Sequence, residues 1–244
     1  MKRIKLLFYD NDIELSSNDL SIGFQGWLME RLPNDIATTL HSLDVNPYSI
    51  YSFVGKHECF IELNILNDEL FEVIDSVIKD EIVLTKGVFS IKEKSIKEID
   101  SKYLANIFYR DDVSNQLEIH FNSPCSFKSN GEYVLFPSVR HIFQSLMSKY
   151  SSLMENDKSV DEELLDSILE KVKITSYNLK SDYYRIHNVM IPGFSGRIRI
   201  TINGAQTLKA YILMLLEFGQ YSGVGIKSSM GMGNIVVQER RKNG

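Results

Sequence analysis

The sequence has few cysteines, no long apolar run and no overall excess of positive charge. Cys59 and Cys125 are the two cysteines among 244 residues, and their wide spacing fits neither a metal site nor a disulfide framework, so we expect buried reduced thiols. No run of about eighteen apolar residues is present, which argues against a transmembrane helix. The stretch "MKRIKLLFYDND" turns acidic before a signal-peptide core forms. These absences predict a cytoplasmic globular protein.

The net charge of −5 argues against a generally basic nucleic-acid binder, but the charge is unevenly distributed. Residues 1–115 carry 12 Lys and Arg against 20 Asp and Glu, a balance of −8. Residues 173–244 carry 10 against 3, a balance of +7. A binding surface for a polyanion is therefore expected in the C-terminal third, although solvated strand faces would give the same pattern.

The order of the expected elements indicates the fold class. In the first half, hydrophobic periodicity and capping residues predict a strand, two short helices, two strands, a helix and an extended segment. Asn34 or Asp35 is the expected N-cap of the second helix. The ranges, in order, are 3–10, 21–32, 34–44, 48–55, 58–66, 67–80 and 81–99. This β-α-β-β-α-β order is that of a ferredoxin-like unit.

A similar order is expected in the second half of the chain. A strand, a helix, an additional acidic helix, two strands joined by a long turn, a helix and a strand are predicted at 115–124, 137–153, 161–172, 173–186, 193–202, 205–218 and 234–238. We therefore predict an α+β protein with two tandem ferredoxin-like (RRM-like) domains. The boundary is placed near "RDDVSN", giving domains of residues 1–113 and 114–244.

The stretch "GVGIKSSMGMG", from Gly223 to Gly233, carries four of the fourteen glycines. Such a cluster is tolerated where a backbone turns unusually or approaches something closely. The stretch follows an expected helix, with Gly219 as its predicted C-cap, and precedes an expected strand. Walker and dinucleotide loops need the strand first, so neither motif fits. A tight helix-to-strand connection and a ligand-binding loop both remain open on these residues alone.

The glycine stretch resembles the C-terminal loop of the RAMP superfamily of CRISPR-associated proteins, as Gly-hydrophobic-Gly, five residues and Gly-hydrophobic-Gly. Within that superfamily the chain is most similar to the sixth Cas family, the endoribonucleases that process precursor CRISPR RNA. Three further stretches carry the resemblance: "DIATTLHSLDVNPYSIYS", "FNSPCSFKSNGEYVLFPSVRHIFQSL" and "GFSGRIRI". Their order and separation extend it over nearly the whole chain.

The resemblance implies binding of a precursor CRISPR RNA repeat against the C-terminal domain, with effector-complex subunits as further partners. It also implies one metal-independent cut per repeat, in which the ribose 2′-hydroxyl attacks the adjacent phosphate. The products are a 2′,3′-cyclic phosphate and a 5′-hydroxyl. Such a reaction needs a base, an acid and positive groups near the phosphorane. The sequence shows no zinc or two-metal carboxylate spacing, so no cofactor is expected.

His41 in "TTLHSL" matches the position of the family's catalytic histidine. A histidine has an ordinary pKa of about 6.5, which suits acid or base catalysis at neutral pH. Some members also use a tyrosine and a lysine, but here the tyrosine position falls on or near Met29 and no lysine follows closely after His41. Tyr48 and Lys56 are the substitutes expected to complete the catalytic set, with Tyr51 and Lys227 as alternatives.

The expected RNA-binding residues lie in the basic C-terminal third. Arg197 and Arg199 alternate with isoleucines and so share one strand face. Tyr183, Tyr184 and Arg185 are expected in the long turn, as part of a hairpin that enters an RNA groove. The glycine loop is expected to direct amides at phosphates. The full set is Lys173, Lys180, Arg185, Arg197, Arg199, Gly223, Gly225, Lys227, Ser228, Ser229, Gly231 and Gly233.

The other histidines lack a motif. His57 is expected to be solvated, His120 and His141 to be structural, and His187 to lie near RNA. Two other functions remain open at this point. One is a non-catalytic RAMP subunit that binds mature guide RNA, and the other is a tandem ferredoxin-like scaffold that binds only proteins. The position of His41 favours a nuclease over the first, and the basic C-terminal third argues against the second.

Overall fold

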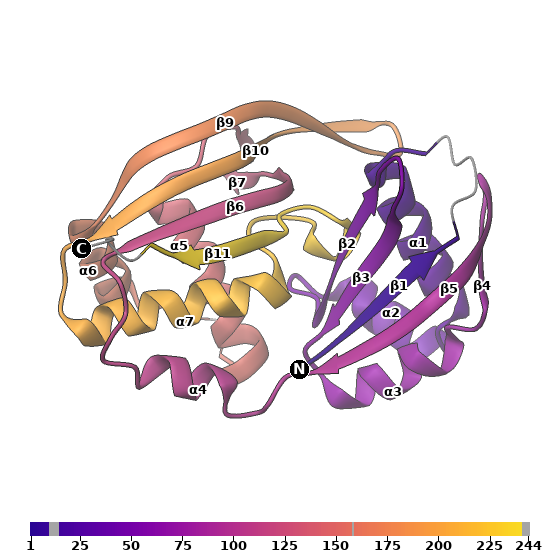
Figure 1. The fold of residues 1–244 in the computed structure, drawn as a ribbon, viewed down its shortest axis with the longest axis horizontal. Coiled ribbons are helices and arrows are strands. Elements are labelled where there is room, and N and C mark those ends of the chain that lie inside the picture. Colours follow the sequence, from indigo (N-terminus) through magenta and orange to yellow (C-terminus); the bar gives the residue numbers. More distant parts are fainter. Residues whose placement is uncertain (10–14, 158, 241–244) are drawn as a thin grey trace. The chain divides into compact units, whose positions relative to one another are not determined.

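The computed structural model describes residues 1–9, 15–157 and 159–240. The chain divides into two compact units (Figure 1). Unit 1 comprises Met1–Ile99 together with Lys227–Gly231, and unit 2 comprises Asp100–Ile226 and Met232–Gly244. No helix among the described residues is long and apolar enough to cross a membrane. The chain divides after Ile99, whereas the expected domain boundary lies after residue 113. The expected boundary stays a prediction.

Unit 1 contains a five-stranded sheet in the order β2-β3-β1-β5-β4. Its strands all pair antiparallel, and the central strand β1 lies between β3 and β5. Without the short edge strand β4, the order is that of a ferredoxin-like fold. The strands are β1 (Lys2–Phe8), β2 (Tyr48–Val54), β3 (Cys59–Ile65), β4 (Glu81–Leu84) and β5 (Gly87–Glu98).

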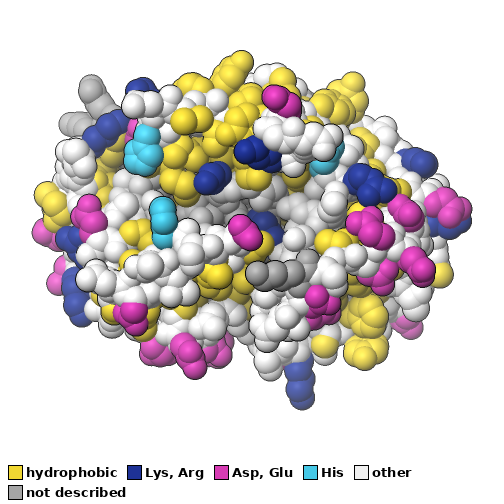
Figure 2. Space-filling model, turned by 180° about the vertical axis from the view of Figure 1, so that it is seen from behind, with side chains coloured by type: hydrophobic (Ala, Val, Ile, Leu, Met, Phe, Trp, Pro, Cys, Tyr) yellow, Lys and Arg dark blue, Asp and Glu magenta, His cyan; other side chains and the backbone are white. Residues whose placement is uncertain are grey.

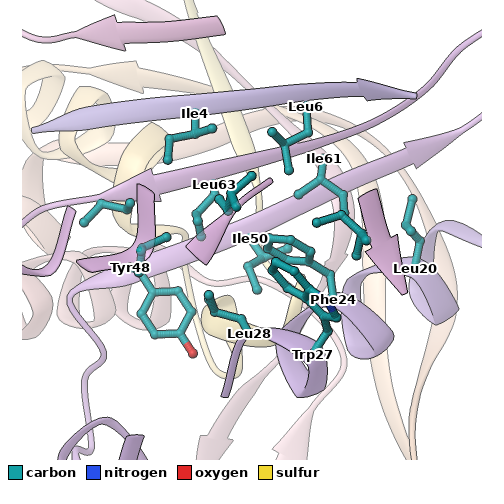
Figure 3. Packing of buried hydrophobic residues seen from close by; sticks show 14 of the residues in the cluster. Ile4, Leu6, Leu20, Phe24, Trp27, Leu28, Tyr48, Ile50, Ile61 and Leu63 are labelled. Atoms are coloured by element: carbon teal, nitrogen blue, oxygen red, sulfur yellow. The ribbon is translucent and has the colours of Figure 1, made fainter. Parts of the chain in front are cut away.

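Three helices, α1 (Ser17–Arg31), α2 (Asn34–Ser42) and α3 (Asp68–Val77), accompany this sheet. Figure 1 shows them on one face of it. Period-2 alternation directs Ile4 and Leu6 of β1 into the core, where they meet α1. Figure 3 shows Phe24 and Trp27 of α1 packed among the isoleucines and leucines of the strands. This packing of one helix layer on one sheet face holds the unit together.

Unit 2 repeats the arrangement with a four-stranded antiparallel sheet in the order β11-β6-β10-β9. The strands are β6 (Gln116–Cys125), β9 (Val172–Ile186), β10 (Val189–Ile202) and β11 (Ile235–Glu239). A separate hairpin is formed by β7 (Phe127–Ser129) and β8 (Glu132–Val134). The helices are α4 (Tyr103–Phe108), α5 (Val139–Tyr150), α6 (Glu162–Lys171) and α7 (Gln206–Ser222), with a π-helical turn at Ser151–Glu155 and a 3₁₀ turn at Ser228–Met230. The expected fold class, two tandem ferredoxin-like domains, is confirmed.

Several local expectations were wrong. Helix α7 continues past Gly219 to Ser222, and Gly223 is its C-cap with a φ of 68°. Helix α2 has Pro33 at its N-cap, without a side-chain cap, in place of Asn34 or Asp35. The long turn between β9 and β10 is absent from the described residues, because both strands continue to Ile186 and Val189.

Candidate functional site

His41 lies in the last turn of α2, and its side chain is exposed. Leu40, its neighbour, is 5% exposed and belongs to the core of unit 1. Successive helical residues point about 100° apart, so burial of Leu40 turns His41 towards solvent. Among the described residues the imidazole has no hydrogen-bonding partner. The exposed imidazole is therefore open to a substrate.

Tyr48 begins β2, directly after the connection that follows α2. Its side chain is 1% exposed, and burial raises the pKa of its phenol to about 12, although hydrogen bonds with Gln25 and Ser229 act in the opposite direction. Figure 3 shows the ring among the apolar side chains, with the hydroxyl at its outer end. The phenol is therefore neutral at physiological pH and is held between α1 and the glycine segment.

Ser229 has a second partner on the same connection. Asn46 Nδ2 lies 3.5 Å from Ser229 Oγ and donates to it, while Asn46 Oδ1 is buried and has no partner among the residues that the structure describes. The glycine segment from Lys227 to Gly231 belongs to unit 1 by its contacts. Ser229 thus attaches this segment to the connection that starts just after His41.

The glycines of the longer stretch Gly223–Gly233 have backbone conformations that other residues rarely adopt. The φ values of Gly223, Gly225, Gly231 and Gly233 all lie between 68° and 102°. At Gly225 and Gly233 a Cβ would also collide with a backbone carbonyl, that of Ser126 and Val224 respectively. Glycine is therefore required there by the packing of backbone against backbone.

The amides of these four glycines are already bonded within the chain. Gly233 N donates to Pro124 O at 2.9 Å, Gly225 N to Ser145 Oγ at 2.8 Å, and the amides of Gly223 and Gly231 to Gly219 O and Ser228 O. The expectation that these amides are directed at phosphates is wrong, because the close backbone packing gives each of them an internal acceptor. Their contribution to RNA binding through loop shape stays a prediction.

Lys149 of α5 is buried and binds the chain where α7 ends and the stretch Gly223–Gly233 begins. Its Nζ donates to the carbonyls of Ser222 at 3.2 Å and Gly223 at 3.0 Å. Burial lowers the pKa of this ammonium to about 8, although charge interaction with Cys125 acts in the opposite direction. These two bonds satisfy carbonyls at the end of α7 that have no partner in the helix. A buried lysine was not among the expected site residues, and a lysine amid apolar helix positions gives no signal of its burial.

Lys227 is the part of the segment that faces solvent. It is exposed and has a φ of 57°, at the start of the 3₁₀ turn Ser228–Met230. Its ammonium is available to an anionic ligand, whereas the hydroxyl of Ser229 is engaged within unit 1. The expected RNA contact by Ser228 stays a prediction.

Lys56 is not brought together with Tyr48. It lies in the connection between β2 and β3, beyond the far end of β2, and the seven residues of that strand separate the two by about 20 Å. Tyr51, on the same strand, packs edge-on against Phe60, and burial together with the carboxylates of Glu62 and Glu58 raises the pKa of its phenol. The catalytic roles of Tyr48 and Lys56 stay predictions.

Arg197 and Arg199 do share one face of β10, since both guanidinium groups lie near Glu118 of β6. Two other expected residues make weaker local contacts: Lys180 pairs with Asp182 at 3.7 Å, and Lys173 lies 3.5 Å from the carbonyl of Leu169. On the face drawn in Figure 2, Lys and Arg side chains form separate groups and not one continuous patch.

The tip of the β9–β10 hairpin differs from the expected long turn. Tyr183 is 63% exposed, but Tyr184 is 2% exposed and therefore cannot contact RNA from its buried position. Arg185 Nε donates to the carbonyl of His187, whose φ is 50°. The expectation for Tyr184 is wrong because residues on a strand alternate between the two faces.

The remaining histidines lie away from His41 in the sequence and differ in their contacts. His141 lies in the first turn of α5, where its amide donates to the N-cap Ser138 and its ring bonds to the same hydroxyl and stacks on Phe127, which is a structural role. His120 bonds to Glu118 at 2.9 Å, and His57 is exposed between β2 and β3. No group of three or more His, Cys, Asp or Glu side chains in the described part of the chain is placed to hold a metal ion.

Comparison with known proteins covers both units. A protein of Streptococcus thermophilus named CRISPR-associated endoribonuclease Cas6 is 39% identical over 240 residues, which are 97% of this chain and 99% of that protein. The chain belongs to the Cas6 family. A Cas6 endoribonuclease of Mycobacterium tuberculosis is 34% identical over 87% of this chain and 70% of its own length. The family model for CRISPR-associated endoribonuclease Cas6 matches residues 119–235.

Solved Cas6 structures share the fold. A Cas6 product complex matches with a TM-score of 0.79 and 20% identity, over 98% of this chain and 100% of that chain. Thermus thermophilus Cas6 matches with a TM-score of 0.74 and 17% identity, over 97% and 98%. At this identity the likeness establishes the arrangement of elements and not the role of any side chain.

Proposed function

We propose that this Cas6 family member cleaves precursor CRISPR RNA within its repeats. The observation that carries the proposal is the 39% identity to a named Cas6 endoribonuclease across 97% of the chain, including the segments that hold His41 and the glycine loop. The exposed imidazole of His41 supports it, because a proton-transferring group must reach the substrate. Membership of the family favours a nuclease over a protein-binding scaffold.

The proposed reaction is an intramolecular transesterification. The ribose 2′-oxygen forms a bond to the adjacent phosphorus, the bond from phosphorus to the 5′-oxygen breaks, and the 5′-oxygen leaves as a hydroxyl. His41 either takes the 2′-hydroxyl proton or donates a proton to the leaving oxygen. We assign to Lys227 the role of balancing charge on the phosphorane, because its ammonium is exposed and can contact an anion.

Tyr48 has a different proposed role from the one expected. Because its phenol is buried, it acts as a positioning residue that holds Ser229, and through it the glycine segment, in unit 1. The catalytic set then consists of His41 and Lys227, with Tyr48 supporting the loop. Nothing in the geometry supports Lys56 as a member of that set.

The test uses the full chain, a CRISPR-repeat RNA from the same genome and EDTA in the buffer. His41→Ala is compared with His57→Ala, a matched control that removes another exposed histidine of unit 1. We expect wild type and His57→Ala to make one cut that leaves a 2′,3′-cyclic phosphate. His41→Ala should bind the RNA with unchanged affinity but cut it at least 100-fold more slowly, the usual contribution of a general acid or base.

Each other outcome has a defined meaning. Binding without cleavage by the wild type would indicate a non-catalytic RAMP subunit. Equal cleavage by His41→Ala and wild type would place the active site elsewhere. Absence of RNA binding would contradict the proposal as a whole and favour the scaffold.

A further inference from the structure

Glu118 lies on a central strand of the sheet of unit 2, and four side chains surround its carboxylate. Its carboxylate accepts from Arg240 Nη2 at 2.9 Å, Arg199 Nη2 at 3.2 Å and His120 Nε2 at 2.9 Å, and Arg197 Nη1 lies 3.9 Å away. The register explains the gathering, since Glu118 of β6 is paired with Arg199 of β10 and with Gln238 of β11. Strands β6 and β10, together with the residue that follows β11, therefore supply one charged cluster.

The cluster has more positive than negative charge. Burial alone would raise the pKa of Glu118, but the hydrogen bonds from Arg199 and His120 and the charge of Arg240 outweigh it, so the pKa is lowered and the carboxylate stays ionised. One carboxylate cannot neutralise three guanidinium groups. At least two positive charges remain on this face at any pH where the protein is folded.

The arginines remain accessible although the carboxylate does not. The side chain of Glu118 is 3% exposed, whereas those of Arg197 and Arg240 are 52% and 47% exposed. Arg199 is less exposed, and its Nε is a buried donor without a partner in the described residues. Each guanidinium has five N–H donors, so contact with one carboxylate leaves Arg197 and Arg240 further donors for a ligand.

We propose that Arg197, Arg199 and Arg240 bind the phosphate backbone of the repeat RNA on the sheet face of unit 2, and that Glu118 positions them. The proposal rests on the proposed function for the identity of the RNA. One arginine would be enough to pair with Glu118 if the cluster served only to stabilise the sheet. Further exposed ion pairs contribute little to the free energy of unfolding. The guanidinium groups, held side by side, repel one another. An anionic ligand that binds between them is attracted to each and so offsets this repulsion.

The chemistry of the face favours phosphates over bases. Bidentate arginine contacts match the geometry of phosphate oxygens. Neighbouring positions on β9 that pair with Arg197 and Arg199 are Asn178 and Ser176, which offer no ring for base stacking. The contacts therefore position the RNA and do not by themselves read its sequence.

The test measures RNA affinity of the full chain by fluorescence anisotropy over a range of salt concentrations. Arg197→Gln and Arg240→Gln each remove one charge from the face. Arg140→Gln is the matched control, since it removes the same charge from α5, where Arg140 pairs with Glu162 and Asp166. The RNAs are the repeat and a scrambled RNA of equal length.

We expect Arg197→Gln and Arg240→Gln each to weaken binding about tenfold, the lower range for one lost charge-assisted hydrogen bond. Each should also reduce the slope of log K against log salt by about one. Arg140→Gln should leave both unchanged. Equal behaviour of all three variants would overturn the proposal.

The Glu118→Gln variant tests whether Glu118 positions the arginines or whether only the net charge of the face matters for RNA binding. It makes the protein more positive by one unit, so a face that acts through net charge alone would bind both RNAs more tightly. If Glu118 positions the arginines, the preference for the repeat over the scrambled RNA falls instead. Far-UV circular dichroism checks folding, and if this variant does not fold, the two arginine variants decide the question.

Cleavage distinguishes this inference from the proposed function. His41→Ala should keep wild-type affinity and salt slope, and Arg240→Gln should slow cleavage at subsaturating protein in proportion to its loss of affinity. Normal cleavage with unaltered binding in the arginine variants would overturn only the inference. Arginine-dependent binding without any cleavage would overturn only the proposed nuclease.

Discussion

Gly233 provides a direct test of why the segment before β11 is rich in glycine. Its φ is 69°, and a Cβ there would collide with the carbonyl oxygen of Val224. The two residues are also joined by a hydrogen bond from Val224 N to Gly233 O at 2.8 Å. The backbones therefore cannot move apart without losing that bond, and Gly233→Ala should be strongly destabilising.

Two other glycines separate the contributions. Gly131 has a φ of 85° but open space around a Cβ, and Gly26 lies within α1 with nothing within 4 Å. Left-handed backbone costs an alanine about 1–2 kcal/mol, the expected loss at Gly131. Overpacking adds about 1–3 kcal/mol, so we expect Gly233→Ala to lose about 2–5 kcal/mol in total. Gly26→Ala should gain up to about 1 kcal/mol, because alanine favours the helix.

Urea unfolding measures these differences. Trp27 is the single tryptophan of the chain and lies in α1 of unit 1, so its fluorescence follows unit 1, while far-UV circular dichroism follows both units. Gly26→Ala should raise the midpoint of the fluorescence transition. In the dichroism signal, Gly233→Ala should lower the midpoint well beyond Gly131→Ala. Equal losses at Gly233 and Gly131 would refute the argument that backbone contact requires glycine there.

Two further predictions concern buried polar groups. Tyr48→Phe keeps the ring but removes the hydroxyl that contacts Gln25 and Ser229, so unit 1 should lose about 1 kcal/mol by Trp27 fluorescence. Single-turnover cleavage should slow while RNA affinity stays constant, and unchanged cleavage would argue against the positioning role. The pKa of Lys149 is lowered to about 8 by burial, so the unfolded chain binds more protons above that pH and stability should rise between pH 8 and 10. Lys149→Met should remove this rise, and equal pH dependence in both proteins would contradict the assignment.

The fold was predictable because the local signals agree with one another. The strand and helix periods in each half give the same β-α-β-β-α-β order, and that order leaves few sheet topologies. The errors lie at element ends. The hairpin of β7 and β8 was missed although Asn130 and Gly131, both with positive φ, form the most typical two-residue hairpin turn.

The site was less predictable because its groups are distant in the sequence. His41 was found through the family likeness, and its exposure is consistent with that expectation. The contacts of Ser229 with Tyr48 and Asn46 join residues more than 180 positions apart. No local pattern reports such a pairing, so the sequence suggested a phosphate loop while the structure gives Ser229 an internal partner.

Glu118 shows the same limit for charge. In the sequence it is one acidic residue in an alternating strand, and the basic C-terminal third is a sum over residues 173–244. Only the pairing of β6 with β10 and β11 brings Arg199, and Arg240 just after β11, onto this carboxylate. The acidic residue then determines where the positive charge is presented, because the guanidinium groups that bond to it hold fixed positions on the sheet. Net charge therefore predicts which region could bind a polyanion, whereas the strand register predicts which of its residues would do so.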